Sequence, residues 1–248
     1  DAVYLDTAAT TLKPKVLIDA TLNFYRSSGS VHRSQYDFPQ TQRYELARDL
    51  VAKRFNVATR DAVIWTSGTT HSLKLVANGL ADSIEAGDEI VISVAEHHAN
   101  FIPWQQLAER KQAKLIVLPL NNDYQIAPET LQTALSERTK IIAINLVSNV
   151  TGIQQPAEQL IPLIRQQCLA KIVLDVAQAV CCEQIDVQAL DADFYAFSAH
   201  KMYGPTGVGV LTGKLSSLEQ LRPLFFGGKM LQQITEQKLT LAELPYRL

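Results

Sequence analysis

Cysteine is scarce in this sequence, and the little that is present excludes two kinds of small stabilised fold. The three cysteines are Cys168, Cys181 and Cys182; two are adjacent, and no pair has the Cys-x-x-Cys spacing. An odd number in this pattern predicts neither a disulfide framework nor a zinc site. Adjacent cysteines could form a redox pair. Because free cysteine is often buried, we favour the interpretation that Cys181 and Cys182 are small buried residues after a strand.

The sequence also lacks a long hydrophobic run, an excess of charge and a basic N-terminal segment. No stretch approaches the roughly 20 apolar residues that span a bilayer, and residues 1–6 lack the basic start and apolar core of a signal peptide. The formal net charge of −2 gives no reason to expect nucleic acid or an anionic membrane as a partner. We therefore expect a cytoplasmic protein without a nucleic-acid or membrane partner.

What is present is an alternation of apolar runs with helical patterns, without repeats, low-complexity tracts or a long linker. The spacing predicts helices at residues 42–55, 70–83, 104–112, 128–135 and 157–167. Apolar runs predict strands at residues 62–66, 89–94, 114–118, 141–146, 172–175, 193–198 and 208–212. Such alternation is typical of an α/β fold, in which a mostly parallel sheet is sandwiched by crossover helices.

The most informative segment is Ser198-Ala199-His200-Lys201. It ends the apolar run 193–198, and Asp175, which ends the preceding run, stands 26 residues before Lys201. Gln178 stands 23 residues before the same lysine. In an open α/β sheet, ligands bind in the crevice at the carboxyl ends of the strands. Both polar clusters are therefore expected to face that crevice.

These residue types together suit pyridoxal phosphate (PLP). A lysine can form a Schiff base with an aldehyde cofactor and then carry protons, and an aspartate can keep a pyridine nitrogen protonated so that the ring accepts charge. Gln178 could donate to the phenolic oxygen of the ring, while Ser198 and His200 could contact phosphate. In isolation, Lys201 would be interpreted as a surface lysine and Asp175 as a turn residue; the combined spacing favours the cofactor.

A second cluster, Ser67-Gly68-Thr69-Thr70, lies between a predicted strand and a predicted helix. Glycine lets the backbone approach an anion, and the first turn of a helix offers free N–H groups with partial positive charge. Hydroxyls of Thr69 and Thr70 add donors. The same residues are ordinary helix caps, but beside a PLP lysine we favour a phosphate-binding turn.

Polar residues also follow two other strands. His97 and His98 come after the strand at 89–94, and Asn149 follows the strand at 141–146. A histidine there could stack on a cofactor ring and exchange protons. Neighbouring residues of an extended chain point to opposite sides, so one metal ion is not expected to bind both histidines. Asn149 could reach the crevice or simply serve in a turn.

Several longer segments make the resemblance specific. The sequence resembles class V aminotransferases, and within them the cysteine desulfurases of the cysteine sulfinate desulfinase and selenocysteine lyase type. The matching segments, which extend over nearly the whole chain, are 4–10, 31–35, 68–70, 96–100, 147–149, 175–178, 194–207 and 227–230.

The resemblance implies the large domain of fold type I, the aspartate aminotransferase-like architecture, and a role for each matching residue. Lys201 is the Schiff-base lysine, Asp175 the partner of the pyridine nitrogen, and His97 the histidine on the ring face. Gln178 and Asn149 lie near the phenolic oxygen. The phosphate is bound by Thr69, Thr70, Ser198 and His200. The catalytic residues are then Lys201 and His97, and no metal is expected.

The sequence differs from the family pattern in three places. Val176 stands where glycine is usual, and His71 stands where glutamate is frequent. In the family, residues such as 244–248 lead into a Gly-Thr-Pro loop and a small C-terminal domain with the nucleophilic cysteine and the carboxylate-binding arginine, which this chain lacks. We expect residues 1–248 to be the PLP-binding large domain, with residues 1–15 as an arm near the active site.

The activity that the resemblance implies is PLP-dependent cysteine desulfuration. Such an enzyme takes sulfur from L-cysteine, or selenium or sulfinate from its analogues, leaves L-alanine and passes the sulfur on as a persulfide. The resemblance also implies a homodimer, a sulfur-acceptor protein and a role in sulfur metabolism and iron–sulfur cluster assembly. Two alternatives remain open: another PLP enzyme of class V, or a folded large domain that cannot turn over substrate.

Overall fold

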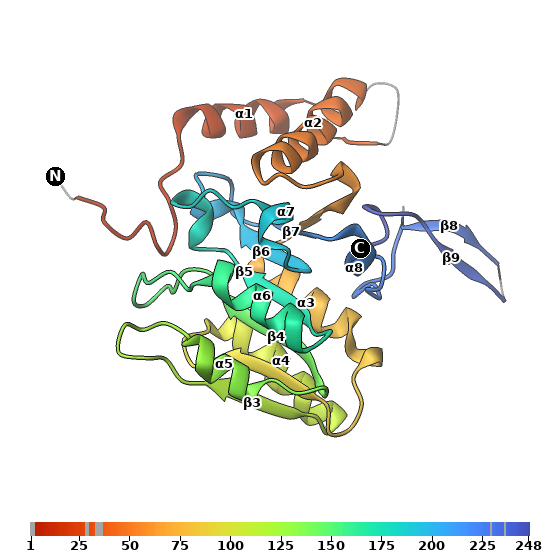
Figure 1. The fold of residues 1–248 in the computed structure, drawn as a ribbon. Helices are drawn as coiled ribbons and strands as arrows, with labels where there is room; N and C mark the ends of the chain where they lie inside the picture. The colour runs from red at the N-terminus through yellow and green to blue at the C-terminus, as the bar shows by residue number, and fades with distance from the viewer. Residues whose placement is uncertain (1–2, 28–29, 33–36, 229, 236) are drawn as a thin grey trace.

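The computed structural model describes residues 3–27, 30–32, 37–228, 230–235 and 237–248 (Figure 1). Its helices are α1 (Lys15–Arg26), α2 (Phe38–Arg54), α3 (Thr69–Gly79), α4 (His98–Lys111), α5 (Pro128–Ala134), α6 (Ala157–Gln167), α7 (Val187–Leu190) and α8 (Leu215–Leu218). Its strands are β1 (Val63–Thr66), β2 (Glu89–Ser93), β3 (Lys114–Leu118), β4 (Thr139–Asn145), β5 (Lys171–Asp175), β6 (Phe194–Ser198), β7 (Gly209–Gly213), β8 (Leu231–Ile234) and β9 (Leu239–Leu241). Arg33, Ser34, Gln35 and Lys229, from two of the matching segments, lie outside the described residues.

The main sheet has the strand order β1-β7-β6-β5-β4-β2-β3, and β7 runs antiparallel to the other six strands. Helices flank it: α3 packs beside α4, and α6 packs beside α5 and α7 (Figure 1). Strand β6 is buried throughout, as expected of a strand covered on both faces. The predicted mostly parallel α/β sheet is thereby confirmed.

Three strands of this sheet have polar ends that meet at one edge. The parallel register pairs Asn145 of β4 with Asp175 of β5, and Asp175 with Ala196 of β6. Strand β6 continues into a short 3-10 turn, Ala199–Lys201. Because the carboxyl ends of parallel strands lie at the same edge, the chain brings Asp175 and Lys201 to one crevice.

A close backbone contact joins this edge to the start of α3. A Cβ atom added to Gly209 of β7 would lie 2.4 Å from Cα of Gly68, which is closer than any side chain allows. Gly68 itself has a φ of +152°, a conformation that residues with side chains rarely adopt. Glycine at both positions therefore lets the turn before α3 lie against the sheet.

Three features of the fold differ from the sequence predictions. Helix α1 and the hairpin of β8 and β9 were not predicted; none of the residues Lys15–Arg26 is buried, and Figure 1 shows the hairpin extending away from the sheet. The prediction that Cys181 and Cys182 are buried was wrong. Both are exposed, and only Cys168 of the three is buried.

Among the residues that the structure describes, none of the helices combines the length with the hydropathy that crossing a bilayer requires.

Candidate active site

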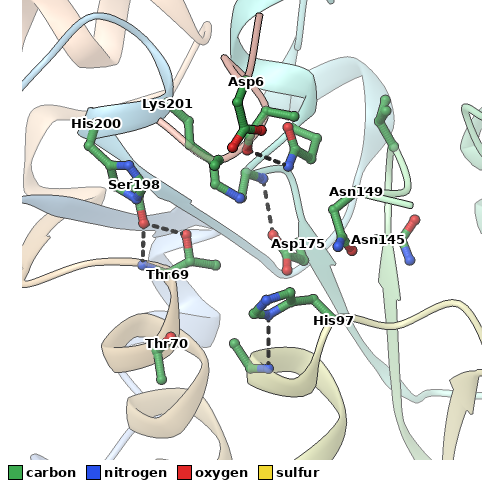
Figure 2. Close-up of a pocket in the computed structure, with 16 residues that line it drawn as sticks. Asp6, Thr69, Thr70, His97, Asn145, Asn149, Asp175, Ser198, His200 and Lys201 are labelled. Atoms are coloured by element: carbon green, nitrogen blue, oxygen red, sulfur yellow. Dashed lines mark hydrogen bonds between the residues drawn. The ribbon is translucent and has the colours of Figure 1, made fainter. Parts of the chain in front are cut away.

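The carboxyl ends of β4, β5 and β6 and the N-termini of α3 and α4 surround a cavity of about 440 Å³ (Figure 2). Every site residue predicted from the sequence lines it: Thr69, Thr70, His97, Asn149, Asp175, Gln178, Ser198, His200 and Lys201. The cavity is also lined by residues that the sequence reasoning did not single out, which are Asp6, Ala8, Ala9, Ala99, Asn145, Val147 and Ala177.

Asp175 forms the deep end of the cavity. Its side chain is buried, and its Oδ1 accepts a hydrogen bond of 3.0 Å from the backbone N–H of Ala177. Burial raises the pKa of the Asp175 carboxyl to about 6, against the opposing effects of the Ala177 hydrogen bond and the charge of Lys201. A buried carboxylate of this kind is stabilised by a cationic partner.

Lys201 extends its amine into the same cavity from the turn after β6 (Figure 2). Burial lowers the pKa of Lys201, and the negative charge of Asp175 opposes that effect. A lowered pKa increases the fraction of neutral amine, which is the nucleophilic form of lysine. The lysine is thus prepared to react with a carbonyl compound.

His97 caps α4 and faces the cavity. Its Nδ1 accepts a hydrogen bond of 3.1 Å from the backbone N–H of Ala99, so in the neutral ring the proton is on Nε2. Burial lowers the pKa of His97, and the nearby charges of Lys201 and His98 lower it further. His98, whose ring lies 6.0 Å from that of His97, is the first residue of α4 and does not line the cavity.

Ser198 and Thr69 line the opposite end, and Gly68 lies next to them. The Thr69 backbone N–H donates to Ser198 Oγ at 2.8 Å, and the two hydroxyls lie 2.7 Å apart. A Cβ atom added to Gly68 would come within 3.3 Å of Ser198 Oγ. The start of α3 therefore presents hydroxyl and backbone donors together, which is an arrangement suited to an anion.

An N-terminal arm, residues 3–13, forms one wall of the cavity. The backbone N–H and the hydroxyl of Thr11, together with Lys13 Nζ, donate to the His200 carbonyl oxygen at 2.9–3.0 Å. Gln178 Nε2 donates to the Ala8 carbonyl oxygen at 3.0 Å. The Nδ1 atom of His200 lies 3.1 Å from Thr10 Oγ1, and burial, Lys201 and Lys13 together lower the pKa of His200.

Asp6 and Asn145 are the polar residues that the sequence reasoning missed. Asn145 ends a strand in the same way as Asp175, so the strand-end pattern could have identified it. Asp6 lies on the arm; the resemblance, and no local pattern, predicts residues 1–15 to lie near the active site, and Asp6 itself was not singled out. Within the described part of the chain, no three His, Cys, Asp or Glu side chains are grouped in a way that suits a metal ion.

The sequence model of the aminotransferase class-V family matches residues 3–248. The chain therefore belongs to the class V aminotransferase family.

Its similarity extends to particular members. A probable cysteine desulfurase of Haemophilus influenzae is 57% identical over 246 residues, which are 99% of this chain and 56% of that protein. Cysteine desulfurase CsdA of Escherichia coli is 43% identical over 250 residues, covering 99% of this chain and 62% of that protein. This chain thus spans somewhat more than half the length of the curated relatives it matches.

Solved structures agree in fold. The crystal structure of Escherichia coli CsdA in its S-sulfonic acid form matches with a TM-score of 0.92 at 42% identity, covering 99% of this chain and 62% of that one. The apo structure of a cysteine desulfurase from Thermococcus onnurineus matches with a TM-score of 0.93 at 31% identity and the same coverage. The described fold is therefore that of the part of these enzymes that this chain covers.

Proposed function

We propose that the cavity binds PLP and that the whole protein is a cysteine desulfurase. The observation that carries the proposal is the meeting of Asp175 and Lys201 in one cavity. The buried carboxyl of Asp175 suits a cationic ring, and the Lys201 amine with its lowered pKa suits an aldehyde. The turn at Thr69, which is rich in donors, suits a phosphate. The residues present therefore fit this cofactor.

We assign each residue the role that its location supports. Lys201 would attach the cofactor, Asp175 would hold the ring nitrogen, and His97 would lie on the ring face. Gln178 and Asn149 would contact the phenolic oxygen. The phosphate would be bound by Thr69, Thr70, Ser198 and His200. Bound PLP supplies an electron sink for charge that develops at the substrate α-carbon.

The protein's own groups would move the protons. Lys201 Nζ, which is half-buried and has a pKa that burial lowers, would take the proton from the substrate α-carbon and return it to form alanine. His97 carries its proton on Nε2, because its Nδ1 accepts from Ala99. Nε2 would donate this proton to the phenolic oxygen or to the leaving sulfur atom. The buried residues around Asp175 would exclude water from the ring nitrogen.

The substrate and the partners are part of the same proposal. The relatives named above are called cysteine desulfurases, which supports L-cysteine or an analogue as substrate and a persulfide as sulfur carrier. We expect the nucleophilic cysteine and the carboxylate-binding arginine in the part of the relatives' length that this chain does not span. We further propose a cytoplasmic homodimer that delivers sulfur to an acceptor protein for iron–sulfur cluster assembly.

Two other functions remain as alternatives. The same cofactor platform could serve another PLP enzyme of class V, because the residues expected to select the substrate lie outside this chain. Alternatively, the 248-residue chain by itself binds the cofactor but does not turn over substrate. Alanine and sulfide release from L-cysteine by the full-length protein supports the desulfurase, and their absence with PLP bound supports another class V activity.

The cofactor assignment is tested with Lys201→Ala. Wild-type protein mixed with PLP should give a visible absorbance band, and borohydride reduction followed by mass spectrometry should find the cofactor on Lys201. Lys201→Ala should lose both signals, whereas Lys114→Ala, which alters a lysine that is 68% exposed on the edge strand β3, should keep both. A wild-type protein without the band, or a label on another lysine, would overturn the assignment.

A further inference from the structure

Asn145 lines the cavity but belongs to no role assigned so far. It is the last residue of β4, and the parallel register sets it beside Asp175 of β5. Paired residues of adjacent strands lie about 4.8 Å apart and project from the same face. Asn145 is 4% exposed, and Figure 2 shows its side chain beside that of Asn149. It thus forms the wall of the cavity next to the buried carboxylate.

The orientation of the Asn145 amide is fixed from one side. Its Nδ2 donates to the Ala95 carbonyl oxygen at 2.9 Å and to Glu96 Oε1 at 3.1 Å. An amide rotated by a half-turn would place its oxygen against these two acceptors. Asn145 Oδ1 must therefore face away from Glu96, and it receives no hydrogen bond from any residue that the structure describes.

Glu96 is itself anchored in the protein core. Ser93 Oγ donates to its Oε1 at 2.5 Å, and Asn100 Nδ2 donates to its Oε2 at 2.6 Å. The Asn100 amide is oriented in turn by Trp104 Nε1, which donates to Asn100 Oδ1 at 2.9 Å. Trp104 is fully buried. A continuous chain of hydrogen bonds therefore runs from the core to Asn145.

A buried acceptor without a donor costs about 1–3 kcal/mol of stability. The chain of hydrogen bonds holds Asn145 Oδ1 in a position where it has no donor among the described residues, so this cost remains. The neighbour on the same face, Asp175, is the group against which a protonated ring nitrogen would bind. Because Asn145 and Asp175 occupy paired positions of adjacent strands, one N–H between their side chains could be shared by both acceptors.

We propose that Asn145 is a further ligand-positioning residue, whose Oδ1 accepts a hydrogen bond from the N–H of the ring bound against Asp175, and that Glu96 holds it in that orientation. This inference rests on the proposed function. It adds a second acceptor for the ring nitrogen and a reason for the polar chain that starts at Trp104.

The test is a PLP titration of the purified protein, followed by its visible band and by equilibrium dialysis. Asn145→Leu keeps the volume and removes the acceptor, so PLP affinity should fall about tenfold, the value of one ordinary hydrogen bond. Glu96→Gln should also weaken binding, because one of its amide N–H groups opposes Asn145 or Asn100. The two effects should be non-additive in the double variant.

Thr212→Val is the matched control. Thr212 Oγ1 is another buried polar atom without a partner among the described residues, but Thr212 lies on β7 and does not line the cavity. Its replacement should leave PLP affinity unchanged. Equal weakening by Thr212→Val, or unchanged affinity in folded Asn145→Leu, overturns the inference. If Asn145→Leu does not fold, unchanged affinity in Glu96→Gln overturns it instead.

The ring contact also has a spectroscopic signature. A change in the acceptors of the ring N–H should shift the pH at which the visible band titrates in Asn145→Leu and in Glu96→Gln. A role confined to stability would lower the melting temperature and leave that pH unmoved, which overturns the inference. Wild-type protein that does not bind PLP refutes the proposed function itself, and this inference with it.

Discussion

Two buried carboxyl groups near the cavity have pKa values well above the ordinary range. Burial raises the pKa of Asp175 from 3.8 to about 6. It raises the pKa of Glu96 from 4.5 to about 7, opposed by hydrogen bonds from Ser93 and Asn100 and assisted by the charge of Asp175. The folded protein therefore holds protons that the unfolded chain has already released over this interval of pH.

The consequence for stability has a definite sign. Because the folded state binds more protons, each carboxyl contributes stability that is fully present below its unfolded pKa and is lost as pH rises through its folded pKa. For Asp175 the loss falls between about pH 4 and 6, and for Glu96 between about pH 4.5 and 7. A cationic ring at Asp175 would lower the pKa of that carboxyl and remove this loss.

Asp175→Asn should reveal this dependence in the protein without cofactor. The asparagine does not titrate, so the variant should gain stability relative to wild type as pH rises from 4 to 7, by up to about 3 kcal/mol at about 1.4 kcal/mol per pKa unit. Urea unfolding at several pH values measures it. For Asp123→Asn, which alters an exposed turn, the curve of unfolding free energy against pH should be parallel to that of wild type. Parallel curves for Asp175→Asn would contradict the assignment.

At the scale of elements, the cavity depends on how closely the turn before α3 approaches β7. The contact is between two backbones, Gly68 and Gly209, and leaves no room for a side chain on Gly209. The same turn carries Thr69, whose N–H and hydroxyl meet Ser198. A displacement of the turn would therefore separate Thr69 from Ser198, the two halves of the proposed phosphate site.

Gly209→Ala should disrupt this contact. We expect the free energy of unfolding to fall by about 1–3 kcal/mol, as overpacking does, and PLP affinity to fall more than affinity for pyridoxal, which lacks the phosphate. Gly228→Ala is the control, because a Cβ there meets nothing within 4 Å. Denaturant unfolding and ligand titration measure both effects. Equal losses of affinity for PLP and for pyridoxal would show that the turn does not bind the phosphate.

The sequence was sufficient to predict the elements that bury apolar runs. Strands β5 and β6 were predicted because each run stops at a polar residue, Asp175 and Ser198, and this also located the site. Helix α4 begins six residues before the predicted helix, because the His97 side chain caps it ahead of Pro103. Helix α1 was missed because none of its residues is buried in the described structure.

Long-range contacts were not predictable from local patterns. The arm wall of the cavity, with Asp6 and Ala8, depends on Thr11 meeting His200, 189 residues away. Cys181 and Cys182 were wrongly expected to be buried because the strand before them is buried. The chain reaches the surface only after the buried Val180, and Cys181 Sγ donates to the Lys201 carbonyl oxygen at 2.6 Å.

At the scale of the whole molecule, hydrogen bonds near Thr11 attach the N-terminal arm to the wall of the cavity. Thr11 is buried, and its Oγ1 donates to the His200 carbonyl oxygen and accepts from the backbone N–H of Tyr203 at 2.8 Å. The arm residues before Thr10 are exposed. A few hydrogen bonds near Thr11 therefore hold a whole wall of the cavity.

Thr11→Val should loosen the arm while the sheet remains folded. Loss of the hydroxyl leaves the Tyr203 N–H without its partner, at a cost of about 1–3 kcal/mol. Trypsin should cut after Lys15 faster, and PLP affinity should fall. Thr21→Val alters an exposed threonine whose hydroxyl bonds only within α1, to Leu17, and should match wild type. Unchanged cleavage in Thr11→Val would show that other contacts hold the arm.

The arm also fixes an order of events during synthesis. Thr11 leaves the ribosome 189 residues before the carbonyl it binds, which at about 5–20 residues per second is a wait of roughly 10 to 40 s. Until residues 198–201 have been made, the carbonyl that Thr11 binds, Lys201 and the partner of Thr69, Ser198, are all missing. The cavity therefore cannot be complete before residues 198–201 have left the ribosome.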